Sequence, residues 1–397
     1  MTDNQINKLP KNWTLKTLGE VAKSTKGKKP INLSETQTDF FSMPYIDIKA
    51  FEKKIFREFT DGEKCNLCNE DDILLVWDGA RCGFVGRGVK GAIGSTLVKI
   101  VSNSLDKSFL FYFLQSNFLM LNTNTRGAGI PHIEPHLLWN LPLHLPPLPE
   151  QQKIVQKIES LFTELETGTK ALKTALTQLK IYRQAVLNHF LTNDDWEIVK
   201  GESLFEYITS GSRGWADYYS EDGAIFLRIT NLNFNTFLLD LRENKIQRVN
   251  LLNVKEGLRT KVQEGDFLIS ITGYLGMFAI VPPDFPEAYV NQHIALCRPK
   301  IGFDKKFVGY FITSKNGGLK QFNDMQKGAT KAGLSLNDIR NLQIPLPSLK
   351  IQTQIVSEIE KRMAGADALE ASLKAQLINA ENLRQSILKR AFEGKLV

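Results

Sequence analysis

The chain has 397 residues, four cysteines and a formal net charge of +7. Its length predicts two domains, and the basic excess, which is spread along the chain, permits a phosphate-rich partner without establishing one. Four cysteines are too few for a disulfide framework, and the sequence has neither the apolar core of a signal peptide nor a run of about eighteen uncharged apolar residues, so we expect a cytoplasmic protein without membrane contact.

The first predicted element is a mixed α/β domain over residues 1–149. The alternating run that begins Tyr45-Ile-Asp-Ile is typical of a strand. Asp106-Lys107, followed by Phe109 and Tyr112-Phe113, is typical of a short amphipathic helix. Strand and helix patterns therefore mix in this segment.

A long helix is predicted next, over residues 150–191. Its apolar residues step by three and four, which is the heptad pattern of a coiled coil. At 1.5 Å per residue the helix would reach roughly 60 Å, too long to bury its apolar stripe on one small domain. The seam positions that we assign to it are Ile154, Ile158, Leu165, Leu172, Leu179 and Val186.

The second half of the chain repeats these elements, as a domain over 192–350 and a helix with a C-terminal tail over 351–397. The segment from Asn140 to Val155, which leads into the first helix, recurs 201 residues later from Asn341 to Val356. The upstream motifs recur with small changes of offset, as loops allow. The seam positions that we assign to the second helix are Ile355, Ile359, Leu369, Leu373, Leu383 and Ile387.

Because the repeat makes the two helices equivalent, one antiparallel pairing about a pseudo-two-fold axis would bury both apolar stripes. Leu172 and Leu373 would then lie near the middle of the shared seam. The expected fold is α+β, a tandem repeat of two homologous globular domains with two long helices that form an antiparallel coiled coil. Ordinary core helices are the less favoured alternative, because such helices average about a dozen residues.

The residues around each helix start resemble those of the specificity subunit of type I restriction-modification enzymes. In both copies Asn-Leu and a Leu-Pro pair precede Gln and Ile-Val at the start of the helix, and residues 383–396 resemble the C-terminus of that family. The resemblance covers essentially the whole chain. One departure is that the turn Pro149-Glu-Gln-Gln becomes Lys350-Ile-Gln-Thr in the second copy, which leaves the cap of the second helix open.

The resemblance implies a fold and a set of partners. Residues 1–149 and 192–350 would be target-recognition domains 1 and 2, each reading one half of a split DNA site. The two spacer helices would hold modification subunits, expected to be two, and set the distance between the halves. The partners would be double-stranded DNA, these adenine methyltransferase subunits with S-adenosylmethionine, and restriction/translocase subunits with ATP and Mg²⁺. No cofactor is expected on this chain.

Motifs for catalysis are not found in the sequence. An adenine methyltransferase needs an Asn/Asp-Pro-Pro-Tyr/Phe loop and a Gly-rich cofactor turn, and neither occurs. Residues 328–335 imitate a phosphate loop, but Leu334 replaces its lysine. We therefore expect no catalytic residue. A self-contained DNA-modifying enzyme and a helical scaffold that does not bind DNA remain as alternatives.

Three of the four cysteines lie close together in the sequence. Cys65 and Cys68 have the spacing of zinc ligands and Cys82 lies within reach, but no second pair or histidine motif completes a tetrahedral site. We expect no metal there. The five histidines, His132 among them, are interpreted as structural.

Three pairs of corresponding loops supply side chains suited to DNA. Such binding needs cations for phosphates and Arg, Lys, Asn, Gln or hydroxyl side chains for base edges. The pairs are 24–29 with 209–215, 125–128 with 326–331, and 78–87 with 272–274 and 291–293. The candidate residues are Lys26, Lys28, Lys29, Arg81, Arg87, Arg126, Ser212, Arg213, Trp215, Tyr274, Asn291, Gln292, Lys327, Thr330 and Lys331.

Roles are expected for some of these residues. Arg126, Lys327 and Lys331 should contact phosphate, and Arg213, beside a Trp215 that we expect to be exposed, is the strongest candidate for reading bases. The loops of the third pair share a glycine but differ in polar groups, as two domains that read different bases would. The alternative is that all of these are solvated or variable loops without a ligand.

Overall fold

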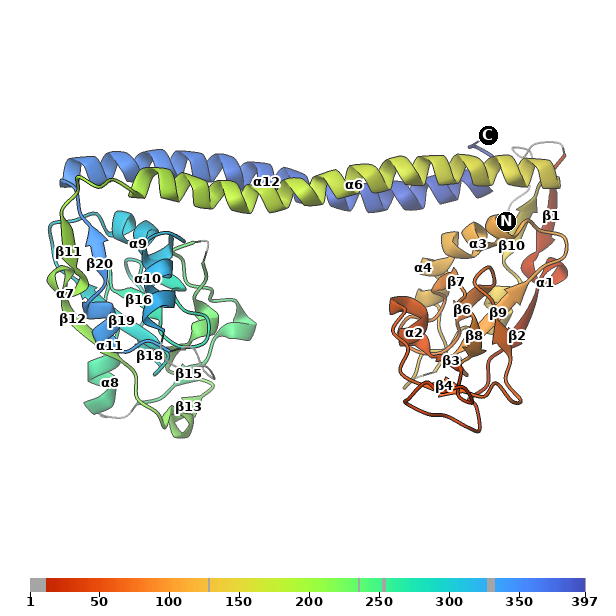
Figure 1. The fold of residues 1–397 in the computed structure, drawn as a ribbon, viewed down its shortest axis with the longest axis horizontal. Helices are drawn as coiled ribbons and strands as arrows, with labels where there is room; N and C mark the ends of the chain where they lie inside the picture. The colour runs from red at the N-terminus through yellow and green to blue at the C-terminus, as the bar shows by residue number, and fades with distance from the viewer. Residues whose placement is uncertain (1–11, 128, 235, 252–254, 327–332, 397) are drawn as a thin grey trace. The chain divides into compact units, whose positions relative to one another are not determined.

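The computed structural model describes residues 12–127, 129–234, 236–251, 255–326 and 333–396 (Figure 1). They form two compact units, of which unit 1 spans Met1–Lys173 with Lys374–Val397 and unit 2 spans Thr174–Leu373. The long helices α6 (Leu148–Leu191) and α12 (Leu349–Phe392) run from one unit into the other, so each unit holds one globular domain and part of each helix. Among the described residues, no helix is long and apolar enough to cross a membrane.

Unit 1 contains the first globular domain. Its strands are β1 (Thr14–Thr17), β2 (Lys23–Lys26), β3 (Met43–Ile46), β4 (Phe59–Thr60), β5 (Leu67–Cys68), β6 (Ile73–Val76), β7 (Val85–Arg87), β8 (Gly91–Ile93), β9 (Leu97–Val101) and β10 (Pro142–Leu145). Its short helices are α1 (Leu18–Val21), α2 (Ile48–Lys53), α3 (Lys107–Ser116), α4 (Phe118–Thr123) and α5 (Pro135–Trp139). The sheets have the strand orders β2-β9-β6-β7, β4-β3-β8-β5 and β1-β10.

Unit 2 contains the second globular domain. Its strands are β11 (Ile198–Lys200), β12 (Phe205–Ser210), β13 (Tyr219–Ser220), β14 (Ala224–Leu227), β15 (Arg248–Val249), β16 (Phe267–Ser270), β17 (Phe278–Ile280), β18 (Ala288–Val290), β19 (Ile294–Pro299) and β20 (Gln343–Pro345). Its helices are α7 (Gly201–Leu204), α8 (Lys255–Thr260), α9 (Lys305–Thr313), α10 (Gly318–Met325) and α11 (Leu336–Arg340), with 3₁₀ turns η2 (Trp215–Tyr218), η3 (Ile229–Asn231) and η4 (Glu243–Lys245). The sheets have the orders β12-β19-β16-β17, β13-β15-β14-β18 and β11-β20.

The two domains share one frame. The antiparallel sheet β2-β9-β6-β7 of unit 1 corresponds to β12-β19-β16-β17 of unit 2. In the other four-stranded sheet, β3 pairs in parallel with β8 as β14 pairs in parallel with β18, and β4 flanks β3 as β15 flanks β14. The structure therefore confirms the predicted α+β tandem repeat.

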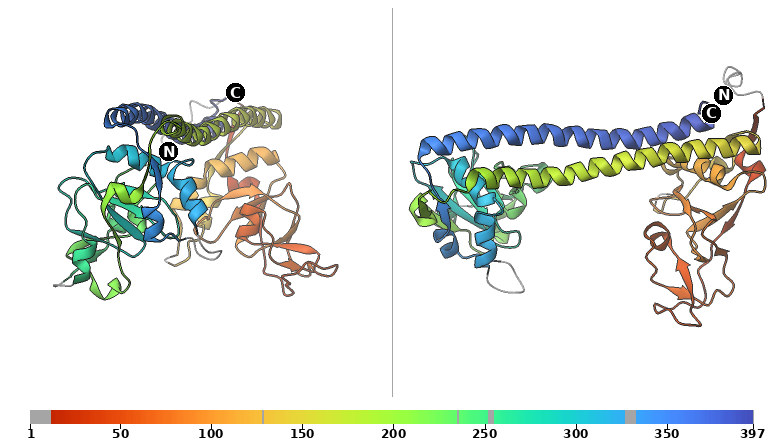
Figure 2. Two further views of the ribbon diagram at one scale, coloured as in Figure 1. Left: turned by 60° about the vertical axis from the view of Figure 1, so that its left-hand side comes forward. Right: turned by 45° about the horizontal axis from the view of Figure 1, so that its top comes forward.

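Short helices join each sheet to the long helices. Helix α3 begins after Asp106, whose carboxylate accepts hydrogen bonds from two backbone N–H groups of its first turn, and Asp304 does the same for α9. These N-caps explain why α3 starts at the predicted Asp106-Lys107 pair and α9 at the corresponding Asp304-Lys305 pair. The apolar faces of α3 and α9 lie in the same hydrophobic cores as the long helices, and Figure 2 shows each beside the helix pair of its own unit.

A buried glutamine anchors each long helix to its domain. The Gln151 side chain accepts a hydrogen bond from the backbone N–H of Asp106 at 2.8 Å and donates one to the carbonyl oxygen of Pro146 at 3.0 Å. Gln352 makes the equivalent bonds with Asp304, at 2.8 Å, and Pro347, at 2.6 Å. The glutamine anchor is therefore retained in the second copy, although the rest of the turn sequence differs there. Both helices begin two residues before the predicted starts.

Replacing Gln352 with alanine should destabilise the second domain. The change leaves two backbone groups without their side-chain partner in a buried site, where one such loss costs about 1–3 kcal/mol. Chemical denaturation should show that loss, whereas alanine at Gln354, which is exposed on the same helix turn, should change the free energy of unfolding by less than about 0.5 kcal/mol. Equal stabilities for the two variants would contradict the anchoring role.

Within each unit the long helices pair antiparallel, as predicted. In unit 2 the Arg183 guanidinium lies 2.7 Å from the Asp367 carboxylate, and the Arg362 guanidinium lies 5.1 Å from the ring centre of Phe190. Residues later in α6 therefore contact residues earlier in α12, as in an antiparallel pair. In unit 1 the Arg384 guanidinium lies over the Phe162 ring, 4.0 Å from its centre. Figure 1 shows the two helices side by side in both units.

The two central arginines of these contacts are equivalent in the repeat. Arg384 also lies 3.6 Å from Glu166, as Arg183 lies 2.7 Å from Asp367. The Arg384 guanidinium thus packs on an aromatic ring beside a carboxylate, whereas the Arg183 guanidinium pairs with a carboxylate and lies 3.9 Å from the Met363 sulfur.

The seam is narrower than the heptad pattern predicts. Seven of the assigned positions are buried, namely Ile154, Ile158, Leu179, Val186, Ile359, Leu373 and Ile387. Leu165, Leu172 and Ile355 are partly buried. Leu369 and Leu383, which were expected in the seam, are 50% and 51% exposed. The placement of Leu172 beside Leu373 stays a prediction.

Candidate nucleic-acid interface

Three candidate loops of the first domain meet at Asp78, in the turn between β6 and β7. The Lys26 ammonium at the end of β2 lies 3.3 Å from Oδ2 of Asp78. Nδ1 of His132 lies 2.7 Å from Oδ1 of the same carboxylate. The backbones of Arg126 and His132 exchange N–H to carbonyl bonds of 3.0 and 2.9 Å. The structure therefore brings together side chains that are up to 106 residues apart in the sequence.

Other candidates of this domain lie around the cluster. Lys28, Lys29 and Arg126 are exposed. Arg81 is half exposed, lies 4.6 Å from the Phe84 ring centre and has its Nε 3.6 Å from Glu52. These four cations are accessible to a phosphate-rich ligand.

Arg87 has a different setting. Its guanidinium donates a 2.7 Å hydrogen bond to the Ser108 hydroxyl and lies 4.6 Å from the centre of the Phe111 ring, both on α3. It joins β7 to α3, and the structure does not bring it into the Asp78 cluster. A role for Arg87 in DNA contact stays a prediction.

The second domain builds its counterpart on Thr272, which occupies the place of Asp78. The next residue in each turn is a glycine with positive φ, 109° at Gly79 and 71° at Gly273, a conformation that favours glycine. The Thr272 hydroxyl lies 2.7 Å from Nδ1 of His293, and the Gln292 amide nitrogen lies 3.0 Å from Nε2 of the same ring. The frame is thus shared while the polar groups differ.

Close backbone packing fixes the Gly-rich loops. A Cβ added to Gly27 would lie 2.2 Å from the carbonyl oxygen of Gly94, and one added to Gly211 would lie 2.3 Å from that of Val290. No side chain fits at such distances, so these glycines hold the loops against the β8–β9 turn and its counterpart, the β18–β19 turn. Ser212 is partly buried and Arg213 is exposed beyond this fixed point.

Trp215 is buried, which corrects the expectation that it is exposed. Its side chain is 5% exposed and stacks on Phe226 with ring centres 4.7 Å apart. Gly214, with φ of 92°, reverses the chain so that η2 begins at Trp215 and carries the indole into a cluster with Val249 and Tyr289. Trp215 therefore supports the loop and cannot stack on a base without leaving this core.

Of the remaining candidates, one is a buried residue that shapes a turn, and others are wholly or partly exposed. Asn291 is 7% exposed, and its side-chain oxygen accepts a hydrogen bond from the backbone N–H of His293, so it shapes the turn. Gln292 is partly buried, and Tyr274 is 73% exposed at the tip of the β16–β17 turn. Lys327, Thr330 and Lys331 lie outside the described residues.

Sequence reasoning missed the groups on which the loops converge. Asp78, Thr272 and His293 fall within the third pair of candidate loops but were not among the candidate residues, and His132 was interpreted as structural. The repeat could have indicated these residues, because the turn at 78–81 aligns with the turn at 272–274 but carries different polar side chains. Aligned turns with different polar side chains are places where the two domains would distinguish different ligands.

Three cysteines of the first domain have zinc-ligand spacing in the sequence. Burial raises the pKa of the Cys65, Cys68 and Cys82 thiols. Across the described ranges, no group of three or more His, Cys, Asp or Glu side chains could hold a metal ion. The spacing of Cys65 and Cys68 reflects their place around β5.

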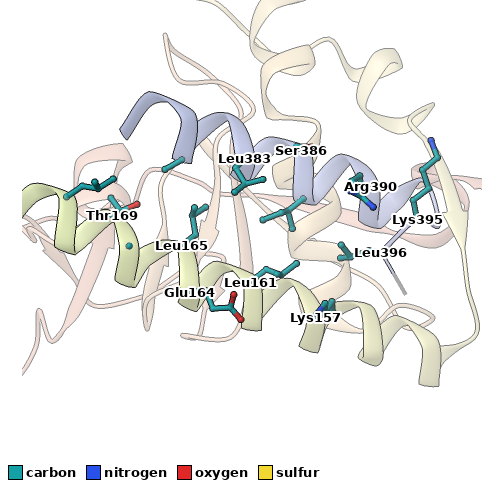
Figure 3. Close-up of a pocket in the computed structure, with 14 residues that line it drawn as sticks. Lys157, Leu161, Glu164, Leu165, Thr169, Leu383, Ser386, Arg390, Lys395 and Leu396 are labelled. Atoms are coloured by element: carbon teal, nitrogen blue, oxygen red, sulfur yellow. The ribbon is translucent and has the colours of Figure 1, made fainter. Parts of the chain in front are cut away.

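A second candidate surface is a groove between α6 and α12 in unit 1, with a volume of about 590 Å³. Leucines of both helices and of the C-terminal tail point into it (Figure 3). Its apolar lining includes Leu161, Leu165, Leu172, Leu383, Ile387 and Leu396. Lys157, Arg390 and Lys395 add positive charge, and Glu164 adds one negative charge. Such a groove suits an apolar protein segment with acidic flanks.

Comparisons with known proteins agree on one family. The model of the type I restriction modification DNA specificity domain matches residues 10–174 and 193–379. The MjaVIII specificity subunit of Methanocaldococcus jannaschii is 26% identical over 98% of this chain and 94% of its own. The EcoBI specificity subunit of Escherichia coli is 27% identical over 75% of this chain and 68% of its own.

Solved structures show the same fold. A chain from a study of complex assembly and conformational transition in the type I R-M system has a TM-score of 0.73 at 20% identity, and the match covers 98% of this chain and 100% of that one. The HsdS subunit from Thermoanaerobacter tengcongensis has a TM-score of 0.56 at 20% identity, with 98% of both chains covered. With two matches to the family model over most of its length, the chain belongs to the type I restriction-modification DNA specificity family.

Proposed function

We propose that this specificity subunit reads a split DNA sequence, with each globular domain reading one half. The observation that carries the proposal is the shared frame with different polar groups at one turn, Asp78 with His132 and Lys26 in the first domain, and Thr272 with His293 and Gln292 in the second. Sequence is read through polar contacts to base edges, whereas phosphate contacts position the protein. Two copies of one frame that carry different polar groups at this turn would read different bases.

The chain is not itself the enzyme. Members of this family determine specificity, and catalysis belongs to partner subunits. We infer that two modification subunits carry S-adenosylmethionine and that restriction/translocase subunits use ATP and Mg²⁺. A self-contained modifying enzyme and a scaffold that does not bind DNA are not favoured, because the family model covers both domains.

The long helices would serve two further roles. Each is one uninterrupted helix of 44 residues, and packed side chains join the two in each unit, so the pair is suited to fix the spacing between two reading domains. The apolar groove of unit 1 would receive a modification subunit. The half-exposed Leu383 and the positive charges at the rim of the groove support this assignment.

Selection from random DNA tests the function. The chain assembled with its modification subunits should enrich a motif of two short specified segments separated by a fixed unspecified spacer. Binding should weaken steeply as salt rises from about 50 to 200 mM, since phosphate contacts release counterions. Enrichment of a single continuous segment, or of none, would contradict the proposal.

Arg213 should contribute to one half only. It is exposed beside the loop that Gly211 fixes, so alanine there should reduce base preference in one of the two segments by roughly fivefold or more at one position. Alanine at Lys300 is the control, because that residue follows Pro299 at the opposite end of the β12–β19 pair. Equal losses on matched and scrambled DNA would mean that Arg213 holds phosphate instead.

A further inference from the structure

His132 is the point at which the candidate loops of the first domain are joined. Its backbone pairs with Arg126 and its ring with Asp78, whose other carboxylate oxygen faces the Lys26 ammonium. The His132 side chain is 40% exposed, whereas that of Asp78 is 17% exposed. The carboxylate is therefore covered by the two groups that it binds, and the imidazole faces outward.

These contacts fix which ring nitrogen carries hydrogen. An ionised carboxylate only accepts hydrogen bonds, so Nδ1 of His132 must donate to Asp78. In a neutral imidazole the other nitrogen, Nε2, then presents a lone pair. Among the described residues Nε2 has no hydrogen-bond partner. Lys26 offsets the negative charge of Asp78, which would otherwise repel DNA phosphate.

We propose that His132 is a specificity-determining residue that accepts a hydrogen bond from the exocyclic amino group of adenine or cytosine. In the major groove these amino groups, N6 of adenine and N4 of cytosine, are the donors of the base edges, whereas guanine O6 and thymine O4 are acceptors. An imidazole held as an acceptor therefore favours adenine or cytosine over guanine or thymine. Asp78 is a positioning residue, since it acts through the ring.

The effect should be confined to one half of the site. In the second domain the residue that pairs with the equivalent turn is Gly333, which bridges Thr272 and has no side chain. The second histidine, His293, reaches Thr272 from the β18–β19 turn instead and also contacts Gln292. The second half of the site thus provides an internal control for every change at His132.

The inference rests on the proposed DNA-reading function, and a two-step experiment separates them. First, the assembled complex selects its motif from random DNA, with the wild-type chain, His132→Ala and, as a matched control, His136→Ala. His136 is exposed four residues further along, and only its backbone makes hydrogen bonds. We expect His132→Ala to lose preference at one adenine or cytosine position of one half, by roughly fivefold to a hundredfold, and His136→Ala to keep it.

Second, the amino group at that position is removed from the DNA, with purine in place of adenine or pyrimidin-2-one in place of cytosine. The wild-type complex should bind this DNA more weakly by the same factor, and His132→Ala should bind both DNAs equally. Asp78→Ala should reduce the discrimination in part. His132→Phe, which keeps a ring without an acceptor, should repeat the alanine result if alanine disturbs the loop.

The outcomes are distinct. A wild-type complex that selects no motif would refute the proposed function itself. A wild-type motif that survives His132→Ala and His132→Phe unchanged would refute only the role of His132. Discrimination lost at a guanine or thymine position, or an amino-group effect that persists in both variants, would refute the acceptor assignment.

Discussion

Lengthening both long helices by one heptad should lengthen the DNA spacer and leave the bases of both halves unchanged. Seven residues copied in register within 170–180 of α6, and within 371–381 of α12, add about 10 Å to a helix at 1.5 Å per residue. Along B-DNA that corresponds to at most about three base pairs at 3.4 Å each. The change should be smaller where the seam is inclined to the DNA axis. Genome-wide mapping of methylated adenines measures the spacer directly.

The control places the same seven residues after Gly302, in an exposed turn between β19 and α9. This chain should methylate sites with the original spacer. If the helix insertion left the spacer unchanged, or altered the specified bases while the spacer stayed constant, then the helices would not set the distance.

Replacing Leu383 with aspartate should prevent assembly with a modification subunit. The side chain lines the groove of unit 1 and is half exposed, so the free chain should keep its fold. In a complex the same change would bury a charge in an apolar contact, and loss of such a central contact costs roughly 3 kcal/mol, or about a hundredfold in affinity. Titration of purified modification subunit into the chain, followed by light scattering, measures both affinity and stoichiometry.

Ile378 provides the matched control for this experiment. It lies on the same helix, is 65% exposed and does not line the groove. Ile378→Asp should bind the modification subunit as the wild type does. Equal binding by the Leu383 and Ile378 variants would place the docking surface elsewhere, and a lowered melting temperature of free Leu383→Asp would assign the residue to the seam.

The long helices and the repeat could be predicted because their signals are local. A heptad pattern that continues from Ile154 to Val186 is typical of a long apolar seam, and the 201-residue offset carries a similar pattern to the second half. The width of the seam could not be predicted in the same way. Leu383 is half exposed where it lines the groove between the two helices, whereas Arg384 beside it packs on the Phe162 ring, and such packing depends on the pairing of two distant helices.

The candidate loops were located by their composition, but their contacts were not. Asp78 and His132 are 54 residues apart, and only the fold of β6, β7 and the segment before α5 brings them to 2.7 Å. Trp215 shows the opposite error. Its neighbours in the sequence, glycines and Arg213, indicate a surface residue. Its packing partners Phe226, Val249 and Tyr289 come from three later strands, so its burial depends on tertiary contacts that the local sequence does not show.

Methylated adenines should be mapped in host cells with this gene intact and with it deleted. We expect a split motif, two specified segments with a constant spacer between them, that is methylated with the gene and unmethylated without it. Restoring the gene with His132→Ala should then relax one segment and leave the other intact. A methylation pattern that is the same with and without the gene would contradict the claim that this chain directs modification to DNA.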